Sequence, residues 1–352
     1  MDRRSHQPFP SRGALDNPAN RYERMHIAFD DSDEDASAET VFYRDASRTV
    51  LAENDSPDIN FRFSLNPYRG CEHGCIYCYA RPTHEYLSFS AGLDFERRIL
   101  VKHDAPELLR AALQAARWQP QIIALSGNTD CYQPVERHLR LTRRCLEVLC
   151  EFRNPVGVVT KSALVARDVD LLAQLAAYGA AQVCVSVTSL DFELARRMEP
   201  RAARPERRLE AIRILTAGGV PVSVLVAPVI PGLNDEEIPR ILAAAAAAGA
   251  KSAGYVLLRL PTPVDALFTE WLNQHYPQRR ERILGRIRAC RDGRLSDPRY
   301  GSRQRGEGVY AKQIAALFAS AVRRYGLNGP AAPLSAAAFR CPPQAGEQLR
   351  LC

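Results

Sequence analysis

The chain has 352 residues, of which 46% are hydrophobic and 25% are charged, the composition of an ordinary globular protein. Its longest apolar run, residues 241–250, is shorter than the roughly 20 residues that a bilayer-spanning helix needs. The N-terminus lacks the apolar centre of a secretory signal. We therefore expect a cytoplasmic protein without membrane association, whose cysteines serve as thiols or metal ligands rather than as disulfides. The net charge of +7 fits either a polyanionic partner or a charged, solvated surface.

Residues 1–55 are polar and contain an acidic run between residues 30 and 35. No apolar period is sustained there, and a segment of this kind cannot bury enough surface to offset the entropy of ordering. We expect a largely disordered N-terminal arm that carries no chemistry.

From residue 56 to residue 262, short apolar runs alternate with longer amphipathic stretches, which is typical of repeated β/α units. The stretches at residues 135–152 and 167–180 have apolar residues at helical spacing. The pattern predicts an α/β fold, a partial parallel barrel of six β/α units. Its six strands are expected at residues 61–65, 122–125, 156–159, 182–187, 222–226 and 254–258.

Residues 263–352 are expected to form a helical C-terminal extension with a loose tail, with helices at residues 265–273, 279–290 and 311–325. Residues 279–305 contain ten arginines and far fewer acidic residues. This arginine-rich segment is a candidate nucleic-acid contact. A solvated helix surface is the alternative interpretation.

Three cysteines, Cys71, Cys75 and Cys78, follow the first predicted strand in a loop that also contains Gly70 and Gly74. A cubane iron–sulfur cluster usually takes four cysteines, so three would leave one iron open to a cofactor. A zinc site completed by His73 is the alternative, although His73 lies inside a short loop that wraps poorly around one ion. The spacing therefore favours a 4Fe-4S cluster.

The segment CEHGCIYC resembles the signature of the radical S-adenosylmethionine (SAM) superfamily, with Tyr77 as its aromatic residue. The surrounding segments NPYRGC, CYARP, SGNTDCYQPVE, VTKS, SVTSLD and VAPVIPGLND resemble the branch related to spore photoproduct lyase, over residues 40–325. The resemblance implies a 4Fe-4S cluster whose open iron binds S-adenosyl-L-methionine, and reductive cleavage of that cofactor to a 5′-deoxyadenosyl radical. It also implies a reductant such as flavodoxin or ferredoxin.

In such barrels, functional groups gather at the carboxyl ends of the strands. By resemblance, the segment after the second predicted strand meets the methionine amino group, although a tight turn is the alternative for SGNTD. Lys161 would contact a carboxylate or the substrate, hydroxyls of the fourth strand would bind ribose or carboxylate, and an apolar segment after the fifth strand would flank adenine with Tyr77. The residues expected to bind the cofactor are Tyr77, Gly127, Asn128, Thr129, Asp130, Ser186, Thr188, Ile230, Pro231 and Gly232.

Cys131 follows SGNTD directly and is therefore expected near the mouth of the barrel. In spore photoproduct lyase, a cysteine outside the cluster donates a hydrogen atom to the product radical. Cys131 is either such a donor or a partly buried spectator thiol. One arginine is also expected to reach the cofactor carboxylate. The candidates are Arg196, Arg197, Arg201, Arg204, Arg207 and Arg208.

Three functions compete. The first is a lyase-like radical SAM enzyme that repairs or modifies nucleic acid. The second is a radical SAM enzyme acting on a small molecule, a peptide or a protein. The third is a metal-binding module without radical chemistry, which is disfavoured because it would not need cofactor-like polar groups at six strand ends.

Overall fold

The computed structural model describes residues 12–22, 39–59, 61–329 and 333–342. Its main sheet has seven strands in the order β10-β9-β8-β7-β6-β3-β2. The sheet stays open because β10 and β2 form its two edges, and this confirms the predicted partial barrel. The strand β2 (Leu51–Glu53) is antiparallel to its neighbour, whereas the parallel strands are β3 (Phe63–Leu65), β6 (Ile123–Leu125), β7 (Val156–Thr160), β8 (Ala181–Ser186), β9 (Val222–Val229) and β10 (Ser252–Leu257).

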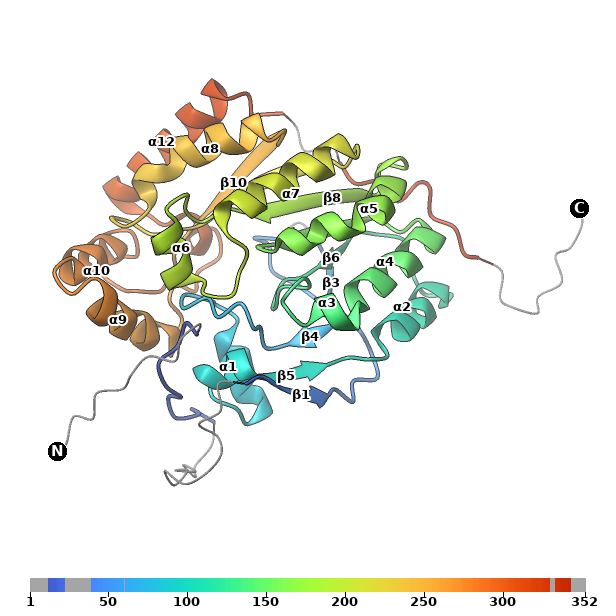
Figure 1. The fold of residues 1–352 in the computed structure, drawn as a ribbon, viewed down its shortest axis with the longest axis horizontal. Coiled ribbons are helices and arrows are strands. Elements are labelled where there is room, and N and C mark those ends of the chain that lie inside the picture. The colour runs from blue at the N-terminus through green and yellow to red at the C-terminus, as the bar shows by residue number, and fades with distance from the viewer. Residues whose placement is uncertain (1–11, 23–38, 60, 330–332, 343–352) are drawn as a thin grey trace, which may run out of the picture.

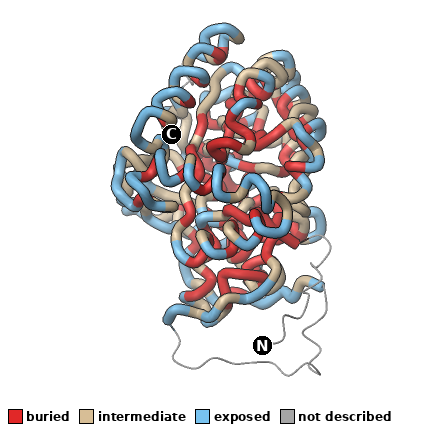
Figure 2. Tube along the Cα trace, turned by 90° about the vertical axis from the view of Figure 1, so that its left-hand side faces the viewer, coloured by how far each residue is buried: buried red, intermediate tan, exposed pale blue. Residues whose placement is uncertain are grey.

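The parallel strands form the centre of the hydrophobic core. Val158, Val183 and Val222 on three neighbouring strands are buried, and they lie in register across the sheet. Strands covered on both faces read as nearly continuous apolar runs, which is why the sequence shows them as short valine-rich segments. Buried residues accordingly concentrate in the interior of the molecule, while the outer faces of the helices are exposed (Figure 2).

Helices between the strands cover the outside of this sheet (Figure 1). The predicted helix at residues 135–152 is two helices, because Arg140 takes a left-handed backbone conformation with φ 53°. The helical elements from residue 81 to residue 247 are η2 (Arg81–Leu87), α1 (Leu93–Arg97), α2 (Ala105–Gln114), α3 (Glu136–Leu139), α4 (Leu141–Phe152), η3 (Ala163–Asp168), α5 (Val169–Ala176), α6 (Phe192–Met198), α7 (Pro205–Ala217), η4 (Asp235–Glu237) and α8 (Ile238–Ala247).

The C-terminal extension is helical, as expected, and packs on the barrel. Tyr255 of β10 contacts Phe318 with ring centroids 4.7 Å apart. Trp271 is buried in a hydrophobic cluster that also contains Cys75 and Tyr77, so the extension shares its core with the cysteine loop. None of the described helices is long and apolar enough to cross a bilayer. The helices of the extension are α9 (Val264–His275), α10 (Arg280–Ala289), α11 (Ser302–Arg305) and α12 (Gly308–Arg324).

The arm at residues 1–55, expected to be largely disordered, contains two strands within residues 41–53. The strand β1 (Val41–Arg44) pairs in parallel with β5 (Arg98–Val101), which also pairs with β4 (Tyr68–Arg69), and β2 pairs with β3. These strands are short and all four residues of β1 are exposed, so backbone pairing forms them without the alternating pattern that sequence analysis detects. Residues 1–11 and 23–38 of the arm, including its acidic run, lie outside the described residues.

His84 is buried beneath the small sheet between two aromatic rings. Its ring centroid lies 5.4 Å from those of Phe89 and Phe95, and its Nε2 lies 2.9 Å from the carbonyl of Arg98. Among the described residues, Nδ1 has no hydrogen-bond partner. Burial lowers the pKa of His84 to about 4, so the imidazole is neutral in the folded protein at neutral pH.

This burial predicts a pH-dependent stability. Between pH 6.5 and 4, His84 is protonated in the unfolded chain but stays neutral in the folded protein. The free energy of unfolding therefore falls as the pH falls. The loss reaches about 3 kcal/mol, at about 1.4 kcal/mol per pH unit. His84→Gln, whose amide can still donate to the carbonyl of Arg98, should lose less stability between pH 7 and 5 in urea unfolding of the protein before cluster reconstitution. An identical pH dependence in the two proteins would contradict this assignment.

Candidate functional site

The three predicted ligands lie on the loop between β4 and η2. Cys71 and Cys75 are each 7% exposed, Cys78 is partly exposed, and all three are free thiols. Hydrogen bonds from the backbone N–H of Cys78 to the carbonyl of Cys75 (3.1 Å) and from that of Cys71 to the carbonyl of Phe95 (2.9 Å) fix the loop. Gly74 allows it to turn with φ +68°.

Burial raises the pKa of all three thiols, and the proximity of the other cysteines raises the pKa of Cys71 and Cys75 further. A bound metal ion would lower the pKa of these thiols, because cysteine binds a metal as the deprotonated thiolate. Among the described residues no three potential ligands converge as they would around a single ion. A cubane does not require such convergence, because each cysteine binds a different iron. The donor set therefore fits an iron–sulfur cluster.

Residues 12–22, which we call the strap, pack against the outside of the cysteine loop. The buried carboxylate of Glu96 accepts hydrogen bonds from the backbone N–H groups of Gly13 (2.9 Å) and Ala14 (2.8 Å) and from Arg81 Nη2 (2.5 Å). Arg81 Nε donates in turn to the carbonyl of Cys75 at 3.0 Å. A continuous buried network thus connects the strap to the backbone of a predicted ligand, which the interpretation as a structureless arm missed.

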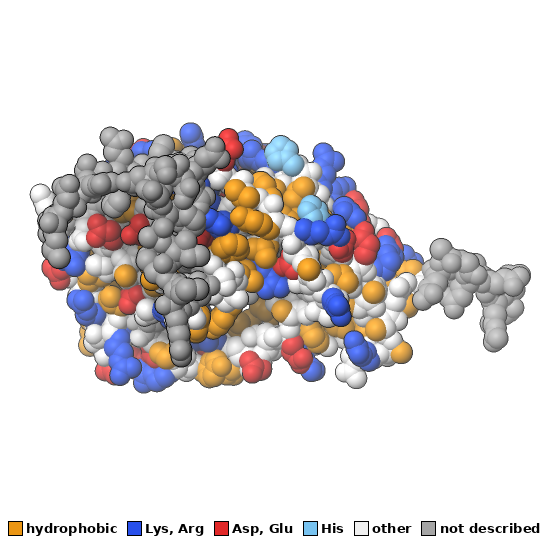
Figure 3. All heavy atoms as spheres, turned by 90° about the horizontal axis from the view of Figure 1, so that it is seen from below, with side chains coloured by type: hydrophobic (Ala, Val, Ile, Leu, Met, Phe, Trp, Pro, Cys, Tyr) orange, Lys and Arg blue, Asp and Glu red, His pale blue; other side chains and the backbone are white. Residues whose placement is uncertain are grey.

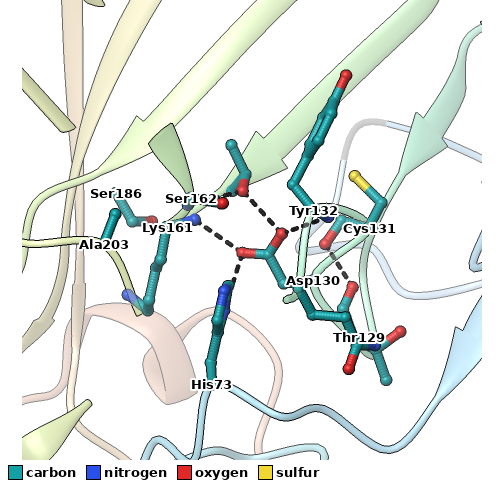
Figure 4. A network of polar contacts seen from close by, with 12 residues as sticks. His73, Thr129, Asp130, Cys131, Tyr132, Lys161, Ser162, Ser186 and Ala203 are labelled. Atoms are coloured by element: carbon teal, nitrogen blue, oxygen red, sulfur yellow. Dashed lines mark hydrogen bonds and ion pairs between the residues drawn. The ribbon is translucent and has the colours of Figure 1, made fainter. Parts of the chain in front are cut away.

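His73 is engaged by the barrel. Its Nδ1 lies 3.4 Å from Asp130 Oδ2, and burial lowers its pKa, so the ring is neutral (Figure 4). Asp130 also accepts hydrogen bonds from Thr160 Oγ1 at 2.7 Å and from the backbone N–H of Lys161 at 2.8 Å. The Asp130 carboxylate therefore holds the cysteine loop against the ends of two strands. This engagement of His73 argues against the alternative of a fourth, zinc-binding ligand.

The SGNTD segment lies at the same rim as the cysteines, as predicted. The hydroxyl of Tyr79, next to Cys78, donates to the carbonyl of Gly127. Asn66 Oδ1 accepts from the backbone N–H groups of Asn128 (3.2 Å) and Thr129 (3.3 Å). The segment is therefore held from both sides, although its contact with a cofactor stays a prediction.

A buried polar network links Lys161 to its neighbouring strands. Lys161 Nζ donates to the carbonyl of Ala227 (2.7 Å) and to Thr188 Oγ1 (3.3 Å), and it lies 3.4 Å from Glu199 Oε1. Burial lowers the pKa of Lys161 to about 8. The ammonium group therefore lies among the ends of β7, β8 and β9, near the cysteine loop.

Glu199, which sequence analysis missed, is the centre of this network. Its Oε1 accepts hydrogen bonds from Thr188 Oγ1 (2.5 Å) and from the hydroxyl of Tyr77, and its Oε2 pairs with Arg208. Burial raises the pKa of Glu199, while the charge of Arg208 opposes that shift. The residue thus connects the aromatic residue of the cysteine motif to the ends of two strands.

The structure narrows the choice among the candidate arginines. Arg208 reaches the rim, but its donors are used by Glu199 and by the carbonyls of Ser186 (3.1 Å) and Ala203 (2.7 Å). Arg201 pairs with Glu72 at 3.0 Å. Contact of an arginine with the cofactor carboxylate therefore stays a prediction, and so does the contact of Lys161.

The segment expected to flank adenine contacts two parts of the fold, the cysteine loop and the C-terminal extension. Ile230 shares a buried cluster with Cys75 and Tyr77, as expected for a wall of the cofactor site. Pro231 follows it, but the carbonyl of Gly232 accepts a hydrogen bond from Arg279 at 2.8 Å, so this turn also faces the C-terminal extension.

Cys131 is fully buried in the main hydrophobic core. Figure 4 shows its sulfur on the side of Asp130 away from His73 and Lys161. This placement favours the spectator alternative, and the role of hydrogen-atom donor stays a prediction.

Two arginines of the arginine-rich segment are engaged within the fold. Arg291 is 1% exposed and donates to the carbonyls of Leu257 (2.8 Å) and Leu258 (2.9 Å), so it holds the end of β10. Arg299 pairs with Asp297. Counting charges along the sequence does not show that Arg291 binds carbonyl oxygens and Arg299 a carboxylate of the same chain.

A hydrophobic groove of about 430 Å³ lies beside the cysteine loop, on the face shown in Figure 3. Phe42, Val135 and Leu139 line it, and so does Glu72, the residue after Cys71. The cysteine loop therefore comes close to the surface on this side.

Comparisons with known proteins agree with this geometry. The profile of the radical SAM superfamily matches residues 65–245. An uncharacterized protein of Mycobacterium tuberculosis is 36% identical over 282 residues, which are 79% of this chain and 80% of the relative. The chain belongs to the radical SAM superfamily. This radical SAM protein is also 28% identical over 176 residues to an uncharacterized protein of Methanocaldococcus jannaschii, covering 50% of this chain and 63% of that relative.

The fold is similar to that of spore photoproduct lyase. A structure of that enzyme complexed with dinucleoside spore photoproduct matches with a TM-score of 0.53 and 17% identity, over 81% of this chain and 78% of the other. A variant with bound AdoMet and the same dinucleoside matches with a TM-score of 0.50 and 17% identity, over the same shares. The similarity at this level of identity is one of fold.

Proposed function

We propose that this protein is a radical SAM enzyme in which Cys71, Cys75 and Cys78 hold a 4Fe-4S cluster and the open iron binds S-adenosyl-L-methionine. One observation carries the proposal: three thiols, two of them buried and one partly exposed, lie at the same rim as the network of Lys161, Thr188 and Glu199. When bound and reduced, the cluster supplies one electron that splits the cofactor into methionine and a 5′-deoxyadenosyl radical. A flavodoxin or ferredoxin is the class of reductant that we expect.

The residues of the chain orient the cofactor and exclude water. In this proposal Lys161 binds the methionine carboxylate, and the hydroxyl of Thr188 fixes the lysine ammonium by accepting from it at 3.3 Å. Ile230 and Tyr77 supply an apolar wall for the adenine. Because the rim is buried, these contacts act in a medium of low polarity, where fixed charges are most effective.

Nucleic acid is the proposed substrate, with repair or modification as the reaction. The support is the fold shared with spore photoproduct lyase, which has been seen complexed with a dinucleoside lesion. The engagement of Arg291 and Arg299 within the fold favours the second candidate, a small-molecule or protein substrate. Oligonucleotides that increase the yield of 5′-deoxyadenosine would decide for nucleic acid.

The cofactor chemistry gives a direct prediction. After anaerobic reconstitution and reduction with dithionite, the wild-type protein should form 5′-deoxyadenosine and methionine in equal amounts, slowly even without substrate. Lys161→Met should weaken binding of S-adenosyl-L-methionine roughly tenfold or more, because a hydrogen-bonded charge pair is lost. The measurement is the cofactor-induced change in the electron paramagnetic resonance spectrum of the reduced cluster.

The matched control is Lys312→Met, since Lys312 is exposed on α12. Cofactor affinity in this variant should equal that of the wild type. Absence of both products from fully reconstituted wild-type protein would support the metal-binding module, and equal affinities in the two variants would remove Lys161 from the site.

A further inference from the structure

Arg259 follows β10, at the carboxyl end of the barrel. Its side chain is partly buried, and its Cζ lies 5.0 Å from the centroid of the Tyr79 ring. In the part of the chain that the structure describes, its guanidinium makes neither a hydrogen bond nor an ion pair. This differs from Arg291 on the same side of the barrel, whose donors bind carbonyls. The donors of Arg259 are therefore available to a ligand.

The position of Arg259 relative to the candidate site follows from Tyr79. Tyr79 is next to Cys78, is 49% exposed, and donates to the carbonyl of Gly127 in the SGNTD segment. A ligand group held by Arg259 would therefore lie beside an exposed aromatic ring, next to both the cysteine loop and the end of β6.

Two further charged groups, Arg303 and Asp58, lie near Arg259. Arg303 of α11 pairs with Asp58 in the loop between β2 and β3, and Asp58 also accepts from the backbone N–H of Gly301 at 2.7 Å. The charge of Arg303 is thus neutralised within the fold. Burial lowers the pKa of Arg259, so an anion bound to its guanidinium would stabilise the charged form.

We propose that Arg259 binds a backbone phosphate of a single-stranded nucleic acid at the barrel mouth, with an adjacent base stacked against Tyr79. This inference rests on the proposed nucleic-acid substrate. A guanidinium offers paired donors that match two phosphate oxygens, and aromatic rings beside basic residues are the usual platform for single strands. A single strand also suits a radical enzyme, because its target base is already out of a duplex.

The test is a salt titration of binding to the reconstituted protein, using two fluorescent ten-nucleotide thymidine oligomers. One has phosphodiester linkages, and the other has uncharged methylphosphonate linkages. Arg259→Gln should weaken binding of the first roughly tenfold or more, flatten its log–log salt slope by about 0.7, and leave binding of the second unchanged. The matched control is Arg323→Gln, because Arg323 is an exposed arginine on α12 outside the arginine-rich segment, and it should resemble the wild type with both oligomers. Iron content and melting temperature report on folding.

Equal losses with both oligomers, equal losses in both variants, or no loss in Arg259→Gln would overturn the proposal. Failure of the wild type to bind the phosphodiester oligomer at low salt would overturn it as well. Formation of 5′-deoxyadenosine without substrate would in that case still support the cofactor chemistry, so the two failures are distinguishable. If Arg259→Gln loses its cluster, Arg259→Lys decides: it should keep the salt slope but bind several-fold more weakly, and unchanged affinity would refute the paired contact.

Discussion

Replacing Cys75 by alanine is expected to abolish the iron–sulfur chromophore. Three thiolates hold the cluster in the proposed site, and loss of one leaves two ligands for a four-iron cubane. Cys75 is the middle ligand, and Arg81 fixes its carbonyl from the strap side at 3.0 Å. The expected result is a near-complete loss of iron and sulfide per chain after anaerobic reconstitution, together with loss of the brown colour.

Cys290→Ala is the matched control for that experiment. Cys290 is also a buried, free thiol, at 1% exposure, but it lies in the main core. Both substitutions remove one buried sulfur, so their effects on the stability of the metal-free protein should be similar, and only the first should affect iron. Equal iron content in the two variants would refute the ligand assignment.

The sequence predicted the sheet well because its strands are internal and parallel. The segment at residues 222–226, for example, appears as a valine-rich run since neighbouring strands and helices cover it from all sides. The strands β1 and β2 escaped prediction for the opposite reason. They lie at sheet edges, are mostly exposed, and pair with partners elsewhere in the chain, so no local period marks them.

The cysteine motif was visible because its chemistry depends on close spacing along the chain. Glu199 was not, since its contacts with Tyr77 join residues 122 positions apart. The same holds for Glu96, which meets the strap across more than 80 positions. In the sequence, such a carboxylate cannot be distinguished from a surface charge, because only the fold shows that it is buried and which distant residues it contacts.

In the C-terminal extension, counting charges along the sequence did not show which arginines are engaged within the fold. Arg291 contributed to a basic segment in the sequence, but in the fold its guanidinium satisfies carbonyls at the end of β10. Arg259 lies outside that segment and was overlooked, although its guanidinium is the one left without a partner beside Tyr79 in the described structure. The availability of a charge, rather than its density along the chain, identifies the better candidate for binding.

Glu199→Gln is expected to destabilise the protein by about 3 to 5 kcal/mol. Glu199 and Arg208 are both almost fully buried, at 2% and 1% exposure, and they form an ion pair. Removing one partner of a buried pair leaves the other charge without compensation in a medium of low polarity. The measurement is the free energy of unfolding in urea, taken on the protein before cluster reconstitution.

The control is Glu193→Gln, which breaks an ion pair with Arg196 whose side chains are 54% and 59% exposed. Solvent screens that pair, so its loss should cost less than about 1 kcal/mol. The double variant Glu199→Gln, Arg208→Gln should recover part of the loss, because it leaves no unpaired charge. Similar costs for Glu199→Gln and Glu193→Gln would show that the carboxylate of Glu199 is not held as an ion. In that case Tyr77, Thr188 and Lys161 would surround a neutral acid, and the ammonium of Lys161 would carry an uncompensated charge at the rim, available to a bound carboxylate.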